Sequence, residues 1–232
     1  MKILSIETSG KICGISILED KKVLKEIVLD NGLTHSETLM PTIKKAFDEL
    51  NHNISDIDLI VCDKGPGSFT GIRIGVATAK AFSDSLNIKT IGVSSLEALC
   101  YNVKKSGVIC SLIDAKNDNC YWCIVENTGR NYIIRRNFDI NNISYILEEL
   151  KNSDLKYDLT FVGDGATNYQ NKILDVLPKS NFCEENISST KLALCGLTHF
   201  NENRNLDELL PMYLRKSQAE IVLEEKQNAK NK

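Results

Sequence analysis

The chain has 232 residues, of which 42% are hydrophobic and 25% charged, the balance of a globular protein with one large domain or two small ones. With 28 basic and 31 acidic residues its net charge is −3, which disfavours a protein that holds RNA by its own phosphate contacts. Glu7 comes too early for a signal peptide, and no uncharged run is long enough to span a membrane. We therefore expect a cytoplasmic protein without membrane contact.

The first half of the chain predicts three successive strands and then alternating helices and strands. Thr34 and Glu37 have capping-box spacing at the start of the first long helix, and Pro41 predicts a kink one turn later. The expected elements are strands at 2–7, 12–18 and 22–29, a helix at 34–50, a strand at 57–62, a glycine-rich loop at 65–71, a helix at 71–86, a strand at 88–93 and a short helix opened by Ser94.

The second half repeats this order. Strands are expected at 107–113, 119–125 and 131–136, a helix at 141–151, a strand at 159–163, a helix at 167–177, a weak strand near 181–183 and a helix at 189–201. The duplicated order βββαβαβα predicts the α/β superfold of actin, Hsp70 and sugar kinases, in which two ribonuclease-H-like domains face a cleft. We place these domains at 1–104 and 105–216, the second being smaller, and expect a polar tail at 217–232 that frays from a helix.

The eight cysteines predict packing in a reducing compartment. Cys62 and Cys110, for example, lie inside apolar runs, where cysteine behaves as a small hydrophobic residue. Cys120 and Cys123 form a CxxC pair within an expected strand, where a spacing of three places the two sulfurs on opposite faces. They are therefore not expected to share a metal or a redox disulfide.

The most specific motif is the glycine-rich segment that runs from Asp63 to Gly75, between a strand and a helix. Gly65 and Gly67 permit a tight turn, and Gly71 allows the helix to start close to the sheet. A helix N-terminus can also attract an anion, although the lysine and hydroxyl of a P-loop are missing. The residues alone support a packing turn and an anion site about equally.

Five motifs in chain order resemble the bacterial TsaB (YeaZ) family over nearly the whole sequence. They are Ile6-Glu-Thr-Ser9, His35-Ser-Glu37, Gly65-Pro-Gly-Ser-Phe-Thr-Gly71 with Arg73, Ile113-Asp-Ala-Lys116 and Pro211-Met-Tyr-Leu-Arg215. The resemblance implies a role in making the threonylcarbamoyladenosine of tRNA, as the partner of the catalytic homologue TsaD. It also implies that the ATPase TsaE docks on this pair, and that any contact with tRNA is indirect.

The residues themselves favour a partner without catalysis. TsaD carries paired metal-binding histidines after the equivalent of the strand at 88–93, where this chain has Ser95 and Leu99. Leucine cannot ligate a metal, and serine is a poor ligand for transition ions. Of the three histidines, none forms a pair spaced for metal binding on one helix face. We expect no catalytic residue and no metal; a metallopeptidase lacks its motif, and His35 with Glu37 reads as helix capping.

A small ATP-dependent phosphotransferase of the same superfold is the alternative. The residues in the places where such kinases contact nucleotide are Glu7, Thr8 and Ser9 in the first hairpin and Gly163, Asp164 and Gly165 in the second domain. Gly-Asp-Gly is also a common turn, and the second domain is short for an adenosine pocket. We therefore expect no cofactor on the chain alone, with ATP or ADP bound only within the complex.

The helix at 71–86 carries the prediction about partners. One stripe suits the domain's own sheet, whereas the opposite side is small and apolar, as in a helix that is covered twice. Three partners could cover this side: the chain's own second domain, TsaD or a second copy of the chain. If the chain is a homodimeric scaffold, its self-association competes with TsaD for this helix face. The resemblance implies an interface to TsaD, or a homodimer when the chain is alone, through this helix and 34–50. The expected contacts are Met40, Phe47, Arg73, Ile74, Ala77, Thr78, Ala81 and Ser85.

Asp114 and Lys116 lie at the turn between two expected strands of the second domain. An ion pair across that turn is the simplest interpretation. The resemblance attaches both residues to a motif, but the residues suggest no chemical role.

Overall fold

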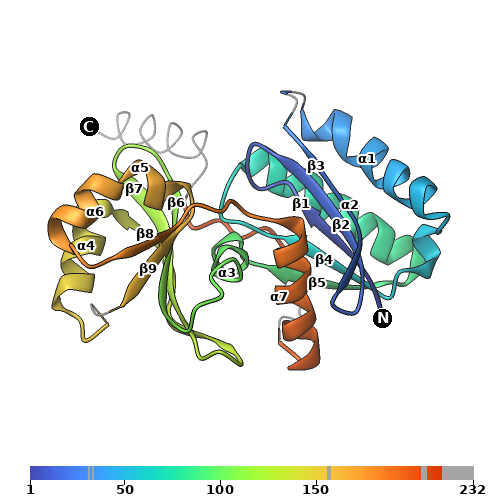
Figure 1. Cartoon of the computed structure of the whole chain (residues 1–232). Coiled ribbons are helices and arrows are strands. Elements are labelled where there is room, and N and C mark those ends of the chain that lie inside the picture. Colours follow the sequence, from blue (N-terminus) through green and yellow to red (C-terminus); the bar gives the residue numbers. More distant parts are fainter. Residues whose placement is uncertain (31, 33, 156–157, 205–207, 216–232) are drawn as a thin grey trace, which may run out of the picture.

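The computed structural model describes residues 1–30, 32, 34–155, 158–204 and 208–215, so the tail predicted at 217–232 lies outside the described residues. The chain forms two lobes, each built on a five-stranded sheet (Figure 1). The strand orders are β3-β2-β1-β4-β5 and, read in the same direction, β8-β7-β6-β9-β10. The same topology therefore occurs twice, which confirms the duplicated α/β architecture expected of the actin-like superfold.

The first lobe holds β1 (Lys2–Glu7), β2 (Cys13–Glu19), β3 (Lys22–Leu29), α1 (His35–Leu50), a 3₁₀ turn η1 (Ile54–Asp56), β4 (Leu59–Asp63), α2 (Phe69–Leu86), β5 (Lys89–Val93) and α3 (Ser95–Cys100). The first three strands are antiparallel, and β4 and β5 continue the sheet in parallel with β1. The capping box at the start of α1 is present, because Glu37 accepts hydrogen bonds from the Thr34 backbone and hydroxyl.

The second lobe holds β6 (Gly107–Asp114), β7 (Asn119–Asn127), β8 (Tyr132–Asn142), α4 (Ile143–Asn152), β9 (Leu159–Val162), α5 (Asp164–Asn168), α6 (Gln170–Val176), β10 (Asn181–Cys183) and α7 (Ser189–Asn201). The prediction of a single helix at 167–177 is wrong. It is two short helices, and the first already starts at Asp164. Tyr169, with φ −109° and ψ 16°, leaves the helical conformation between them.

The two faces of the first sheet are covered by different helices. On one face α1 and α2 pack over β1, β2 and β4 in one hydrophobic cluster. On the other face lies α7, which packs against β1, β2, β4 and β5 although it follows the second sheet in sequence. This placement corrects the assignment of the last helix to the second domain. Both α3 and α7 lie between the lobes (Figure 1), and α3 contacts β6 and β7 of the second sheet.

The packing role predicted for the cysteines is confirmed. All eight cysteines are free, and seven of them are buried. Cys120 packs under α4, whereas Cys123 belongs to the cluster on the opposite face of the second sheet. The period-two alternation of strand β7 therefore separates the two sulfurs as expected. Among the described residues, no helix is both long and apolar enough to cross a bilayer.

Candidate functional site

The glycine-rich loop packs against the carboxyl end of β1. Ser68 donates its backbone N–H to the Ser9 carbonyl at 2.7 Å, and the Thr8 hydroxyl donates to the Gly71 carbonyl at 2.8 Å. The side chain of Ser68 caps α2 by accepting a hydrogen bond from the Gly71 amide. The loop is therefore held by β1 on one side and by its own helix cap on the other.

Close approach of backbone explains the glycines of this loop. A Cβ added at Gly71 would lie 1.9 Å from the Thr8 carbonyl oxygen, and one at Gly67 would lie 2.4 Å from the Ser9 carbonyl oxygen. Neither oxygen can move without displacing β1, because both belong to its backbone or the turn that follows. Of the two interpretations that the sequence left open, these contacts support the packing turn.

Two buried carboxyl groups meet where β1 and β4 end side by side. The parallel register pairs Ile6 with Cys62, so Glu7 and Asp63 follow on neighbouring strands, and both are at most 1% exposed. Glu7 accepts hydrogen bonds from the Ser9 amide and hydroxyl, and Asp63 accepts from the Gly65 amide and the Ser95 hydroxyl.

One oxygen of each carboxyl, Oε2 of Glu7 and Oδ2 of Asp63, has no donor among the described residues. Burial, and after it the facing Asp63 carboxylate, raises the pKa of Glu7 well above its ordinary value of 4.5. A single proton held between the two groups satisfies both oxygens. The sequence analysis named Glu7 but missed Asp63 as its partner, because the pairing depends on strand register.

This arrangement predicts a pH-dependent stability that Glu7→Gln removes. Above pH 4.5 the folded state still holds a proton that the unfolded chain has lost, so the free energy of unfolding falls as the pH rises through the folded-state pKa of Glu7. An uncharged amide can donate to Asp63 at every pH, so we expect Glu7→Gln to be more stable than wild type by about 1 kcal/mol or more at pH 8.

Urea unfolding at pH 5 and pH 8 measures this effect. The wild type should lose stability relative to Glu7→Gln between these two values. If the difference between the two proteins is the same at both pH values, the shared proton is not there.

A cavity of about 330 Å³ lies between the lobes and brings together candidate nucleotide contacts from both. Glu7 and Ser9 reach it from the first lobe, and Asp164 reaches it from the second. The charged side chains that line it are three acids, Glu7, Asp30 and Asp164, and one base, Lys11. A surplus of acids opposes phosphate binding unless a cation or a partner supplies positive charge.

The remaining candidate nucleotide contacts are occupied by packing. Thr8 is fully buried against the glycine-rich loop. Gly163 has φ +103°, and a Cβ there would lie 2.3 Å from the Leu112 carbonyl oxygen. A Cβ at Gly165 would lie 3.0 Å from the carbonyl carbon of Leu112. Close packing against Leu112 therefore explains the two glycines of the Gly-Asp-Gly turn without a bound ligand.

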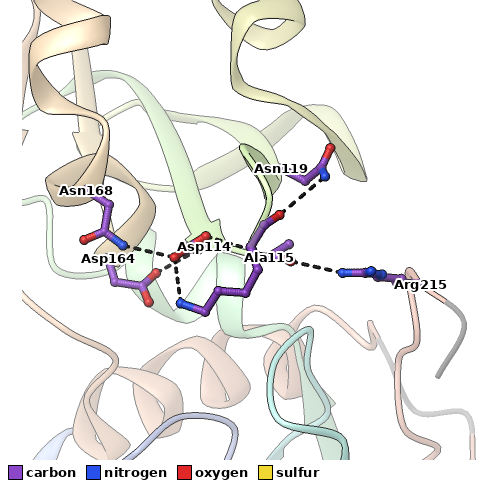
Figure 2. A network of polar contacts seen from close by, with 7 residues as sticks. Asp114, Ala115, Asn119, Asp164, Asn168 and Arg215 are labelled. Carbon is purple, nitrogen blue, oxygen red and sulfur yellow. Dashed lines mark hydrogen bonds and ion pairs between the residues drawn. The ribbon is translucent and has the colours of Figure 1, made fainter. Parts of the chain in front are cut away.

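Three motifs of the sequence meet in one polar network of the second lobe, shown in Figure 2. The Asp114 amide donates to Asp164 at 2.9 Å, and the Asp114 carboxylate accepts from Lys116 and from Asn168. The Arg215 guanidinium donates to the Ala115 carbonyl at 3.1 Å. The ion pair expected between Asp114 and Lys116 is confirmed. The network links Arg215 to the turn after β6.

Most of the outer side of α2 is left uncovered by the described part of the chain. Ala77, Ala81 and Ser85 are exposed, and Ile74 and Thr78 are half-buried. The helix packs on β4, β5, β1 and α1, so the second domain does not cover this side. The inner stripe is buried at Ile72, Val76 and Ala79 as predicted, but its last member, Leu86, is 40% exposed. We call the side formed by Arg73, Ile74, Ala77, Thr78, Ala81 and Ser85 the α2 outer face.

An aromatic pair extends the α2 outer face at the amino end of the helix. Phe69 and Tyr213 stack with ring centroids 4.7 Å apart. Arg73 donates to the Tyr213 hydroxyl at 2.7 Å, and Tyr213 is 42% exposed. Tyr213 belongs to one of the sequence motifs, but its contact with α2 could not be predicted from the sequence, because 140 residues separate it from Arg73.

The two expected contacts on α1 differ. Met40 is 49% exposed and lies on α1, the helix that packs against α2. Phe47 is only 6% exposed and packs in the hydrophobic core of the first lobe. This corrects the expectation for Phe47, which serves the core rather than the surface, because it lies on the inner stripe of α1.

Ser95 and Leu99, at the spacing of the TsaD metal ligands, are both buried on α3. The Ser95 hydroxyl donates to Asp63 at 2.6 Å, and Leu99 lines the cavity between the lobes. Neither supplies a nitrogen or thiolate ligand that a transition ion would need there.

Comparison with known proteins gives a consistent result. The family model described as TsaD, tRNA N6-adenosine threonylcarbamoyltransferase, matches residues 30–223. A Bacillus subtilis protein named tRNA threonylcarbamoyladenosine biosynthesis protein TsaB is 32% identical over 227 residues, which cover 95% of this chain and 96% of that protein. A protein of the same name from Buchnera aphidicola is 25% identical, with 91% and 97% covered.

Solved structures show the same fold. YeaZ from Pseudomonas aeruginosa has a TM-score of 0.76 at 21% identity, with 92% of this chain and 99% of that chain covered. A ROK hexokinase from Thermus thermophilus has a TM-score of 0.53 at 10% identity, with 87% and 100% covered. The similarity to the hexokinase shows that this chain shares its fold with a sugar kinase, and it shows nothing about function.

Proposed function

The chain belongs to the TsaB family of tRNA threonylcarbamoyladenosine biosynthesis proteins, and from this membership we propose that it is a non-catalytic subunit that binds and stabilises TsaD. In this proposal it also helps to recruit the ATPase TsaE, touches tRNA only through the complex and works in the cytoplasm. The chain acts by linkage: a partner that binds only the competent state of TsaD raises the population of that state.

The observation that carries the proposal is the α2 outer face. An exposed helix side usually bears several charged residues. This one has a single arginine, which bonds to Tyr213 next to the aromatic pair, and beyond it an isoleucine, alanines, a threonine and a serine. Side chains this small let another helix approach closely. An 18-residue helix is about 27 Å long, enough for the centre of an interface of ordinary size.

The ends of β1 and β4 favour a chain without catalysis. Glu7 lines the cavity and Asp63 faces Glu7, but both are buried and each is held by hydrogen bonds from its own loop. Ser95 and Leu99 replace metal ligands on α3. These features favour a subunit that keeps the fold of an enzyme and works through its surface.

Mixing the chain with TsaD tests the proposal directly. Size-exclusion chromatography with light scattering should show a homodimer of the chain alone and a heterodimer with TsaD. TsaE should join the heterodimer and neither subunit by itself. A chain that stays unchanged in mass when TsaD is added would contradict the proposal.

The phosphotransferase alternative rests on the cavity between the lobes, and nucleotide binding by the isolated chain distinguishes it from the non-catalytic subunit. We expect calorimetric titration of the isolated chain with Mg-ATP to show no binding and the protein to show no ATP hydrolysis, because acids outnumber bases in the cavity lining. Nucleotide binding should appear only when TsaD is present. Turnover by the chain alone that Glu7→Ala abolishes would establish the alternative.

A further inference from the structure

Three buried metal-ligating side chains converge where α3 crosses α7. Glu97 comes from α3, and Cys195 and His199 are one turn apart on α7. They are 6%, 0% and 2% exposed, and their ligand atoms all lie within 4.8 Å of one another. None of the three lines the cavity between the lobes, so this cluster is separate from the site described above.

The Nε2 nitrogen of His199 contacts two groups, the Glu97 carboxylate and the Cys195 sulfur. It lies 3.2 Å from Glu97 Oε1 and 3.7 Å from Cys195 Sγ. One nitrogen carries at most one proton: if it donates to the carboxylate, it cannot accept from the thiol, and if it accepts from the thiol, it faces the carboxylate without a proton. Hydrogen bonding therefore satisfies one contact and leaves the other unmade.

A metal ion at the centre satisfies all three groups. Zinc bonds of about 2.0–2.3 Å to nitrogen, oxygen and sulfur give tetrahedral edges of roughly 3.3–3.7 Å. The separations of His199 Nε2 from the Glu97 oxygen and from the Cys195 sulfur, 3.2 and 3.7 Å, are close to these edges, and the third separation is at most 4.8 Å. A void of about 10 Å³, close to the space that one water molecule needs, borders Glu97 and His199 on the side of Tyr101 and Arg204.

A donor lies beside the sulfur of Cys195. Burial, and after it the charge of Glu97, raises the pKa of the Cys195 thiol, so the thiol keeps its proton until a metal ion takes its place, and the Tyr101 hydroxyl can then donate to the bound sulfur. Outer donors of this kind orient metal ligands. A set of one sulfur, one nitrogen and one oxygen selects zinc-like transition ions over magnesium or calcium.

We propose that Glu97, Cys195 and His199 form a binding site for a zinc-class divalent ion. On binding, the Cys195 S–H bond breaks and a sulfur–metal bond forms, while His199 coordinates through Nε2 in the form that carries its proton on Nδ1. The thiol proton, and any second proton of the imidazole, go to solvent, with no change of oxidation state. Because α7 packs on the first sheet and α3 contacts the second, the ion ties together the two helices that lie between the lobes. This proposal departs from the expectation of no metal. The sequence offers no local motif for the site, because Glu97 is 98 residues from Cys195.

Titration of the full chain, stripped of metal by a chelator, with cobalt(II) or zinc tests this site. We expect one equivalent of cobalt to bind with a thiolate charge-transfer band and the ligand-field bands of a tetrahedral ion. Zinc should displace it and raise the thermal unfolding midpoint. Cys195→Ala should lose the charge-transfer band and bind more than about 100-fold more weakly, since even outer-shell changes weaken binding by 10–100-fold.

Matched variants keep the test decisive. Cys183→Ser removes the one cysteine that is not buried and should leave the titration unchanged. Glu97→Gln keeps the size of the side chain and should weaken binding, which covers the case in which Cys195→Ala does not fold. No stoichiometric binding to the wild type, a band that survives in folded Cys195→Ala, or unweakened binding in Glu97→Gln overturns the proposal, as does loss of binding in Cys183→Ser.

Discussion

Ala77→Glu is expected to abolish binding to TsaD while the chain stays folded. Ala77 is exposed and lies in the middle of the α2 outer face, so the new carboxylate is solvated in the free chain and its free energy of unfolding should change by less than about 0.5 kcal/mol. In the complex the new carboxylate is buried in the interface and has no opposite charge to pair with, which costs about 3–5 kcal/mol. The affinity should therefore fall by more than about 100-fold.

Titration of TsaD with each variant, together with light scattering of the chain alone, measures this loss. Ser144→Glu is the matched control, because it adds the same charge at an exposed helical position of the second lobe and should bind normally. If folded Ala77→Glu keeps wild-type affinity, the α2 outer face is not the partner surface. Loss of self-association together with TsaD binding would show that the two partners compete for it.

Gly71→Ala is expected to destabilise the fold strongly. The added Cβ would lie 1.9 Å from the Thr8 carbonyl oxygen and 3.0 Å from Cδ2 of His35. Relief requires either β1 or the start of α2 to shift, and the Thr8 hydroxyl bond to the Gly71 carbonyl would be lost with that shift. Overpacking against rigid neighbours costs up to about 3 kcal/mol, and we expect a loss at the upper end of that range or beyond.

Gly10→Ala is the control for this substitution, because nothing lies within 4 Å of a Cβ at Gly10. Urea unfolding of the two variants should give a large loss for Gly71→Ala and a change near zero for Gly10→Ala. Equal stability of the two variants would refute the argument that backbone contact dictates the glycines of the loop.

Elements with strong local signals were predictable from the sequence. The strand at the start of the chain, the capped helix α1 and the opposed sulfurs of Cys120 and Cys123 each follow from a period or a spacing that a few neighbouring residues carry. The break at Tyr169 was missed, because no proline or glycine marks it and the conformation of that residue depends on packing.

Surface roles were harder to predict than elements. The inner and outer sides of α2 follow from its helical period, but the assignment of Phe47 to the interface was wrong, because a stripe boundary does not tell how far a large ring turns inward. Tyr213 joined Phe69 and Arg73 only in three dimensions.

The sequence by itself determined the duplicated order of elements, the family and the small-residue side of α2, because periodicity and contiguous motifs are local properties of a chain. Only the tertiary structure decided that Glu7 faces Asp63, that α7 covers the first sheet and that Glu97 meets Cys195 and His199. Each of these contacts joins residues far apart in sequence, and strand register and helix packing bring them together through the burial of side chains that belong to no single motif.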